Sequence, residues 1–249
     1  EMWERFCYYG MRTLLTLFLV KSLMKGDAEA SLIYGAYTSL VYAAPILGGR
    51  MADKFLGYRY AVMLGAVLMA IGEFLILGNT EHAMLLGMGA LIVGNGYFKA
   101  NISTIVGKLY KDNDPRRDSG FTIFYMGINA GAFLGILLCG YIGEKVGWHY
   151  GFGLAGIFMF FGMLQFFYAQ KIFGNIGLSP KNTEDIDDVF EDSLEDTKEA
   201  IEAVVDHSSK SKITSDRLKV IGVFSFFTIF FWWAFEQAGG SMTIFAADY

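Results

Sequence analysis

The chain consists largely of apolar blocks of about 20 residues, the length that a helix needs to cross the hydrocarbon core of a bilayer. Hydrophobic residues make up 54% of the 249 residues and charged residues only 18%, which is too apolar for a soluble domain of this size. No block has the alternating pattern of a barrel strand, so all are expected to be helices. The predicted spans are residues 1–24, 31–52, 60–79, 83–107, 119–143, 149–171 and 218–246.

These blocks divide the chain into three regions. Residues 1–173 are expected to form an N-terminal six-helix transmembrane bundle, residues 174–217 an acidic cytoplasmic linker, and residues 218–249 the seventh transmembrane helix. The linker spaces apolar residues at partly helical intervals among acids from Asp185 to Val205, which predicts a solvated connector with some amphipathic helix. A regulatory docking segment is the alternative. The chain has no initiating Met, so it is expected to be a fragment, and no cleavable signal peptide is visible.

Lys and Arg are concentrated at alternate ends of the predicted spans. They lie between spans two and three, between spans four and five, and in the acidic linker, whereas the opposite loops hold only Lys21, Lys25 and Lys145. Basic residues favour the cytoplasmic side. The pattern therefore predicts a multi-pass membrane protein with a cytoplasmic N-terminus.

Several function classes lack a matching pattern in this sequence. Both cysteines, Cys7 and Cys139, lie inside apolar blocks, which argues against a disulfide framework and a metal site. No nucleophile with its base and no phosphate-binding loop occurs, so an enzyme is not expected. The net charge of −5 comes mostly from the linker, and no nucleic-acid partner is expected.

The first span carries ionisable residues that a membrane helix normally avoids. Glu1, Glu4 and Arg5 fall within about one helical turn, and Arg5, Tyr9 and Arg12 recur at i, i+4 and i+7 along one face. Glu1 and Glu4 would also fit the headgroup level, where charged side chains reach water. Arg12 lies about 18 Å along the axis from Glu1, too far to reach the near interface easily. Such buried ions mark a substrate pathway or a proton relay.

Polar residues also interrupt the later spans. Lys99 lies near the middle of span four, Asn129 in span five and Glu236 in span seven. A structural ion pair with Glu1 or Glu4 is the alternative reading for Lys99. Glu73 in span three has no obvious partner, so a structural hydrogen bond or an interface position is favoured over a substrate role.

Together these groups predict a mixed-charge cavity between helix bundles, which suits a zwitterionic or anionic solute. The same carboxylates are candidates to carry protons, because burial favours the neutral form whereas a neighbouring Arg favours the ionised form. The row Gly127, Gly131 and Gly135 in span five predicts a face where two helices pack closely.

Four short motifs give this arrangement a family resemblance. GGRMADKFLGYR at 48–59 resembles the loop signature of the major facilitator superfamily. EMWERFCYYG at 1–10 fits the ExxERFxYYG signature of the proton-dependent oligopeptide transporters, and FYMGINAG at 124–131 fits that family's FYxxINxG. FKAN and FEQ resemble its fourth- and seventh-helix motifs. The motifs occur in the family's order, and the resemblance covers the chain except for the acidic linker.

The resemblance implies an all-α polytopic membrane protein of the major facilitator superfamily. Two six-helix bundles rock about a central site in this family and import di- and tripeptides with protons. The chain would then hold the N-terminal bundle and the first helix of the C-terminal bundle. Protons are the only coupling ion implied, without a cofactor. The protein is expected to function as a monomer in the lipid bilayer of the plasma membrane, a bacterial inner membrane in particular.

The motif matches also assign roles to individual residues. The peptide carboxylate end is expected to contact Arg5, Tyr9, Lys99 and Asn129, with Tyr42 as a fifth contact. Glu1 and Glu4 are expected as proton-linked partners of Arg5 and Lys99, and Glu236 is the third proton-coupling candidate. Arg12 and Glu236 are expected to pair across the two bundles as part of an outer gate. Asp53, Lys54 and Arg59 are expected to hold cytoplasmic helix ends together during rocking.

The sequence departs from the family pattern in two places. Some members carry a proton-linked histidine on span two where this chain has Gly35, so coupling would rest on the three glutamates. Many bacterial members insert two extra helices between spans six and seven, where this chain has the linker. Alternative functions are transport of another small solute such as nitrate, and a nutrient receptor that binds without transport.

Overall fold

The computed structural model describes residues 1–78, 80–111, 114–179 and 207–248, and its regular elements are all helical within these ranges. The predicted amphipathic segment at 185–205 lies outside the described residues. The long helices are α1 (Met2–Lys21), α2 (Asp27–Met51), α3 (Tyr58–Ile76), α4 (Glu81–Lys108), α5 (Arg117–Lys145), α6 (Trp148–Ala169), α9 (His207–Glu236) and α10 (Ser241–Asp248). Three short turns join them: η1 (Ala52–Leu56), η2 (Gln170–Phe173) and η4 (Gln237–Gly239).

Six spans in the described part of the chain are long and apolar enough to cross a membrane, with α9 and α10 counted together as Arg217–Asp248. Helix α1 is not among them, although the sequence predicts a span there. Its Glu4, Arg5 and Arg12 lower its hydropathy, and all three side chains are buried among other helices. Helix α1 is therefore a central helix whose polar residues face protein.

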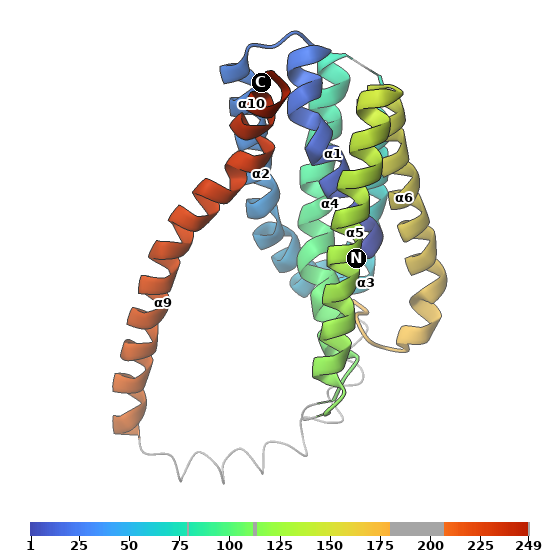
Figure 1. Ribbon diagram of the computed structural model, residues 1–249. Coiled ribbons are helices and arrows are strands. Elements are labelled where there is room, and N and C mark those ends of the chain that lie inside the picture. Colours follow the sequence, from blue (N-terminus) through green and yellow to red (C-terminus); the bar gives the residue numbers. More distant parts are fainter. Residues whose placement is uncertain (79, 112–113, 180–206, 249) are drawn as a thin grey trace.

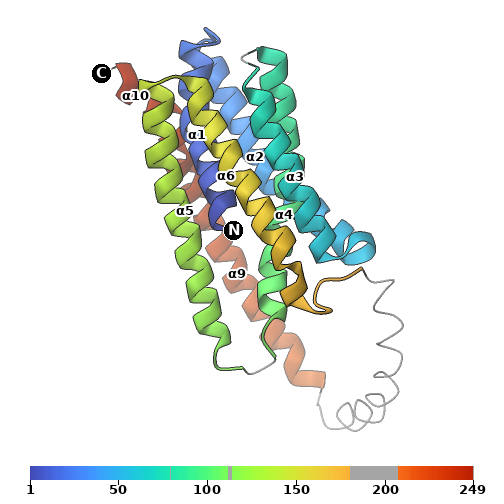
Figure 2. The same ribbon diagram turned by 90° about the vertical axis from the view of Figure 1, so that its right-hand side faces the viewer.

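The N-terminal bundle has two groups of three helices. Helix α1 packs against α5 and α6, helix α4 packs against α2 and α3, and contacts between α3 and α6 join the groups. Figures 1 and 2 show these helices running roughly side by side from two directions. Helix α9 diverges from the bundle toward its start (Figure 1), while η4 and α10 contact α1.

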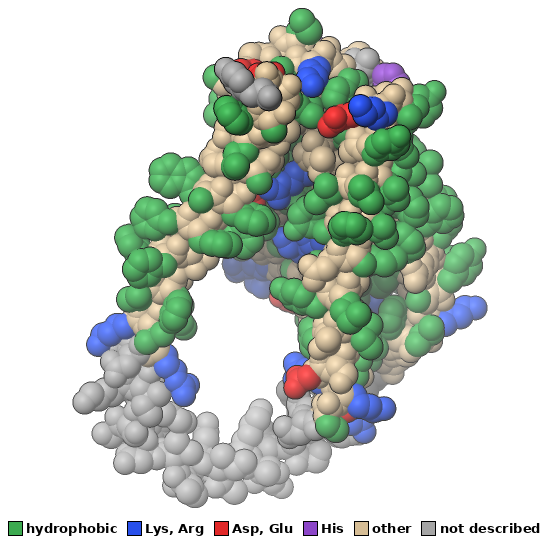
Figure 3. All heavy atoms as spheres, viewed as in Figure 1, with side chains coloured by type: hydrophobic (Ala, Val, Ile, Leu, Met, Phe, Trp, Pro, Cys, Tyr) green, Lys and Arg blue, Asp and Glu red, His purple; other side chains and the backbone are tan. Residues whose placement is uncertain are grey.

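The surface of the helices suits a lipid environment. Large hydrophobic side chains are exposed along α5 and α9, including Phe133, Phe224 and Phe230. Figure 3 shows hydrophobic side chains over the visible faces of these helices, with Lys and Arg gathered at the lower end. The basic end holds the α2–α3 and α4–α5 connections, as the charge pattern predicts.

The seventh span differs from its prediction in two ways. The described helix already includes His207, upstream of the predicted start at residue 218, and it is not continuous to residue 246. Helix α9 ends at Glu236, the turn η4 follows, and α10 starts after Gly240, whose φ and ψ are −109° and −108°. Two consecutive glycines explain the break, because glycine has a low helix propensity.

At the end of the bundle opposite the basic end, one lysine forms hydrogen bonds that connect two helices. Lys25, between α1 and α2, donates hydrogen bonds of 2.8 Å to Glu29 and to Glu81, at the start of α4. These bonds raise the pKa of Lys25, because they favour the charged ammonium group. The α1–α2 connection is thereby tied to the first turns of two helices.

The predicted close-packing face on α5 is confirmed. A Cβ atom added at Gly131 would clash with the carbonyl oxygen of Met2, and one added at Gly135 would clash with that of Phe6. Gly127 is less crowded, since its nearest neighbour would be the Met2 Cβ at 3.7 Å. The backbones of α1 and α5 thus meet at Gly131 and Gly135, which holds the polar face of α1 in place.

Substitution of Gly135 is expected to destabilise the bundle. Gly135→Ala should cost about 1–3 kcal/mol, because the added methyl group forces the α1 backbone away. Gly127→Ala is the matched control on the same face and should leave the melting temperature nearly unchanged. Thermal unfolding of both purified variants in one detergent measures the difference, and equal melting temperatures would contradict this packing role.

Candidate functional site

A buried ion cluster lies at the start of α1. The Arg5 Nε lies 2.9 Å from Glu1 Oε1 and 3.1 Å from Glu4 Oε2, so one guanidinium nitrogen serves both carboxylates. Arg5 is 7% exposed and Glu4 is 1% exposed. Charges this deep are stable only when paired, and removal of one partner strands the other.

Glu4 also connects this cluster to α4. The Asn95 Nδ2 donates a hydrogen bond of 3.2 Å to Glu4 Oε1, and both side chains are almost completely buried. The carboxylate of Glu4 therefore bridges Arg5 of its own helix and Asn95 of α4. A change in the charge of Glu4 would alter both contacts.

Lys99 faces a tyrosine ring rather than a carboxylate. Its Nζ lies 4.3 Å from the centroid of the Tyr42 ring, a cation–π contact between α4 and α2. Neither Glu1 nor Glu4 lies within ion-pair distance of Lys99 in the described structure, so the partnership of these acids with Lys99 stays a prediction. The two acids converge on Arg5, which leaves the Lys99 ammonium group open to an anionic ligand.

A second polar cluster lies further along α1 and joins three helices. The Arg12 Nη2 forms an ion pair with Glu236 Oε2 of α9, and the Arg12 Nε donates a hydrogen bond of 2.5 Å to the Tyr34 hydroxyl of α2. The Tyr34 hydroxyl also lies 3.4 Å from Glu236 Oε2. The structure therefore brings together the two predicted gate residues, with Tyr34 between them.

A cavity of about 820 Å³ lies between α2 and α9 beside this second cluster. Tyr42 and Glu236 line it, and the Tyr42 ring lies 6.4 Å from the ring of Trp232. Its remaining lining combines hydroxyl groups with aromatic rings, including Thr38, Ser39, Thr228 and Trp233. Such a surface offers both hydrogen bonds and apolar contacts to an organic solute.

Two predicted substrate contacts lie apart from the ion cluster. Asn129 is exposed on α5, and its Nδ2 donates a hydrogen bond of 3.0 Å to the Tyr125 carbonyl of the same helix. Tyr9 is half-buried, with its ring 6.0 Å from the Arg12 guanidinium carbon. The structure places Tyr9 between the two clusters, while Asn129 makes no described contact with Arg5 or Lys99.

The predicted conformational loop divides into an exposed and a buried part. Asp53 and Lys54 are exposed in η1. Arg59 is buried, and its guanidinium group donates hydrogen bonds to the carbonyl oxygens of Gly174 and Ile176, just past η2. Within the described residues, Arg59 therefore holds the segment that follows α6 against the start of α3.

Glu73 has the structural hydrogen bond that the sequence favours. It is completely buried, and the Cys7 Sγ donates a hydrogen bond of 3.1 Å to its Oε1. Cys7 and Cys139 are both free and buried, as their apolar surroundings predict. No group of His, Cys, Asp and Glu side chains in the described ranges is arranged to hold a metal ion.

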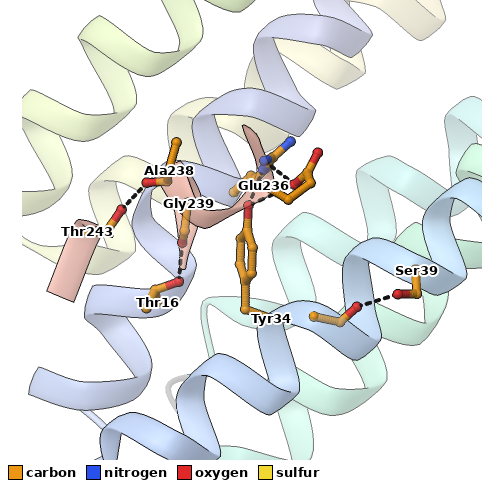
Figure 4. Close-up of polar contacts among 9 residues, drawn as sticks. Thr16, Tyr34, Ser39, Glu236, Ala238, Gly239 and Thr243 are labelled. Atoms are coloured by element: carbon orange, nitrogen blue, oxygen red, sulfur yellow. Dashed lines mark hydrogen bonds and ion pairs between the residues drawn. The ribbon is translucent and has the colours of Figure 1, made fainter. Parts of the chain in front are cut away.

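Sequence reasoning missed Tyr34 and Thr16. The Thr16 Oγ1 donates a hydrogen bond of 2.6 Å to the Gly239 carbonyl, next to the Arg12–Glu236 pair (Figure 4). A spacing signal was available for both, because Thr16 follows Arg12 by four residues and Tyr34 precedes Tyr42 by eight. Both intervals keep side chains on one helix face.

Comparison with known proteins shows the family of the chain. The family model described as "POT family" matches residues 59–191. Dipeptide and tripeptide permease A of Escherichia coli is 36% identical over 182 residues, which cover 72% of this chain and 36% of that protein. The peptide transporter YePEPT of Yersinia enterocolitica is 43% identical over 176 residues, covering 67% and 34%. The chain thus spans about a third of the length of these relatives.

Solved structures agree with this assignment. A bacterial homologue of the human drug peptide transporters matches with a TM-score of 0.75 and 29% identity, covering 99% of this chain and 60% of the other. A POT family transporter in complex with a thioalcohol-conjugated peptide matches with a TM-score of 0.68 and 32% identity, covering 81% and 44%. The predicted helical transporter fold is confirmed, and the chain belongs to the POT family, the proton-dependent oligopeptide transporters.

Proposed function

We propose that the full-length protein imports di- and tripeptides with protons across the plasma membrane by alternating access. The observation that carries the proposal is the placement of Arg5 between two buried carboxylates, near a Lys99 that has no carboxylate partner in the described structure. The names of the relatives support peptides as the substrate class.

The two cations suit the carboxylate end of a peptide. A charge-assisted hydrogen bond is about twice as strong as a neutral one, and Lys99 can offer it without breaking an ion pair. Arg5 becomes available only when its hold on the glutamates weakens. Tyr42 and the aromatic side chains of the neighbouring cavity would accommodate the rest of the peptide.

Proton coupling follows because Glu4 and the peptide carboxylate compete for Arg5. Protonation of Glu4 from the outside removes its charge and weakens its ion pair, so Arg5 can bind the peptide carboxylate. Occlusion of the site follows, and the inward-facing state releases peptide and proton. The membrane potential assists entry of the positive charge by about 2.3 kcal/mol per 100 mV.

The gate and the orientation belong to the same proposal. Arg12 and Glu236 would close the outer side of the site, and the basic ends of the helices would face the cytoplasm together with the N-terminus. Asp53, Lys54 and Arg59 would stabilise the cytoplasmic side, where Arg59 already holds the segment after α6. Asn129 remains a candidate contact in a state that brings α5 closer to the peptide.

Uptake of labelled dialanine by the full-length protein in liposomes tests the proposed function. An inward proton gradient should produce accumulation, and collapse of the gradient should abolish it. Binding of dialanine without flux would instead support a nutrient receptor. Uptake of nitrate in the absence of peptide uptake would support another solute.

Lys99 should provide selectivity for a free carboxylate. Wild-type protein is expected to bind dialanine about 10- to 100-fold more tightly than its C-terminal amide, the range for a hydrogen bond between charged groups. Lys99→Gln should remove most of this difference. Lys108→Gln is the matched control, because Lys108 also lies over a tyrosine ring of another helix, at 4.7 Å from Tyr58, but at the end of α4. Competition binding measures the ratio, and an unchanged ratio in Lys99→Gln would exclude this contact.

A further inference from the structure

The Arg12–Glu236 pair has a third member that does not change charge in the physiological range. The Tyr34 hydroxyl accepts a hydrogen bond of 2.5 Å from Arg12 Nε and lies 3.4 Å from Glu236 Oε2. Figure 4 shows the Tyr34 side chain reaching from α2 toward Glu236. Tyr34 is 4% exposed, and the Arg12 guanidinium carbon lies 5.5 Å from its ring centroid.

Arg12 therefore uses two different nitrogens for two different partners. Its Nη2 is paired with Glu236, whereas its Nε is bonded to Tyr34. Loss of the Glu236 charge would weaken the first contact and leave the second intact. The phenol ring also holds the guanidinium group by a cation–π contact that is independent of Glu236.

We propose that Tyr34 is a positioning residue of the outer gate, which keeps Arg12 in the closed arrangement while Glu236 is protonated. This inference rests on the proposed gate and adds a function for α2 in it. Protonated Glu236 would remain between Arg12 and Tyr34, so the gate stays closed while a proton occupies it. When Glu236 releases the proton, Arg12 is already in position, so the Arg12–Glu236 ion pair forms again directly.

The groups around this cluster define what can titrate. Helix α1 contributes Arg12 and Tyr8, helix α2 contributes Tyr34 and Tyr42, and helix α9 contributes Glu236. Arginine and tyrosine keep their usual charge between pH 5 and 8. Glu236→Gln therefore removes the carboxylate of this described cluster and leaves an uncharged side chain of the same shape, as protonation would.

A second contact across the gate is independent of charge. The Thr16 hydroxyl donates a hydrogen bond of 2.6 Å to the Gly239 carbonyl, where α9 has given way to η4. Neither group titrates. Loss of this contact should weaken closure by the same factor whether or not Glu236 is replaced by Gln, which separates it from the effect of Tyr34.

Pulsed electron paramagnetic resonance distances test the proposal. Spin labels at positions 27 and 248 of the full-length protein report the separation of α2 and α10, both exposed at this end. Wild-type protein and Glu236→Gln should both remain mostly closed. Tyr34→Phe alone should also be closed, but the closed-to-open ratio should fall about tenfold when Tyr34→Phe is added to Glu236→Gln.

Two control variants make the result decisive. Thr16→Val should lower the closed-to-open ratio by the same factor with and without Glu236→Gln, and Thr13→Val should change nothing, because the described hydrogen bond of the Thr13 hydroxyl goes to the Tyr9 carbonyl of its own helix. An effect of Tyr34→Phe that is the same with and without Glu236→Gln would overturn the proposal. So would a Tyr34→Phe protein that is open while Glu236 is intact, because Tyr34 would then be needed whatever the charge at that position. The distances require no peptide, so absence of peptide uptake would refute the proposed substrate without affecting this test.

Discussion

Glu4→Gln is expected to abolish proton-driven accumulation of peptide while it preserves exchange of peptide across the membrane. Glutamine keeps the shape of the protonated side chain but cannot release a proton, so Arg5 would be permanently less restrained. The variant should still fold, because Glu1 remains 2.9 Å from Arg5 and balances its charge. Accumulation under an inward proton gradient and counterflow of labelled dialanine without a gradient measure the two activities.

Glu73→Gln is the matched control for this prediction. Glu73 is also a completely buried glutamate of the same bundle, but its described partner is the Cys7 thiol rather than a cation. We expect this variant to accumulate peptide like wild type. If Glu4→Gln also accumulates peptide fully, Glu4 is not the coupling residue, and Glu1, which shares Arg5, becomes the next candidate. Loss of counterflow in Glu4→Gln would instead indicate that the carboxylate is needed for binding.

Most of the fold could be predicted because the membrane imposes one strong constraint. A span must satisfy its backbone hydrogen bonds internally, so long apolar blocks are sufficient to predict helices. The prediction of spans from hydropathy fails where the helix propensity of glycine or the burial of charged residues matters more. The Gly239–Gly240 step interrupts the seventh span despite its apolar sequence, and the charged α1 falls below the hydropathy of its neighbours although the bundle encloses it.

The charged members of the candidate site and the pairings of Arg5 and Arg12 were predictable, whereas the contact of Lys99 with Tyr42 was not. Buried ionisable residues are rare enough in a membrane protein that Arg5, Lys99 and Glu236 stand out in the sequence. The partner of Lys99 depends on helix rotation and on offsets between helices, which one sequence does not specify. Both acids at the head of α1 reach Arg5, while Lys99 meets the ring of Tyr42 instead.

The hydroxyl groups of the site were the hardest to predict from the sequence. Tyrosine and threonine are ordinary residues in apolar helices, so neither Tyr34 nor Thr16 attracts attention by composition. Their function emerges only when α1, α2 and α9 are brought together, where each uses an uncharged hydroxyl group to form a hydrogen bond beside an ion pair. Neutral contacts of this kind let a charged gate lose its charge without losing its geometry.

Arg12→Ala is expected to open the outer gate and to abolish accumulation of peptide. The substitution removes both the ion pair with Glu236 and the hydrogen bond to Tyr34, so two of the four described polar contacts at the gate disappear together. Thr38→Cys supplies a reporter, because Thr38 lines the cavity one turn beyond Tyr34. The native thiols Cys7 and Cys139 are buried and should contribute little background. Labelling by a membrane-impermeant maleimide from outside should be about tenfold or more faster in Arg12→Ala.

A double-mutant cycle separates loss of the gate from general loosening of the bundle. Arg12→Ala and Glu236→Ala remove opposite ends of one ion pair, so the double variant should label little faster than either single variant. Arg116→Ala is the matched arginine control, because Arg116 is exposed and paired with Asp114 at the other end of the bundle. Its labelling should equal that of wild type. Additive effects of the two gate substitutions would mean that Arg12 and Glu236 act separately, whereas unchanged labelling in Arg12→Ala would remove Arg12 from the gate and leave closure to Thr16 and the C-terminal helices.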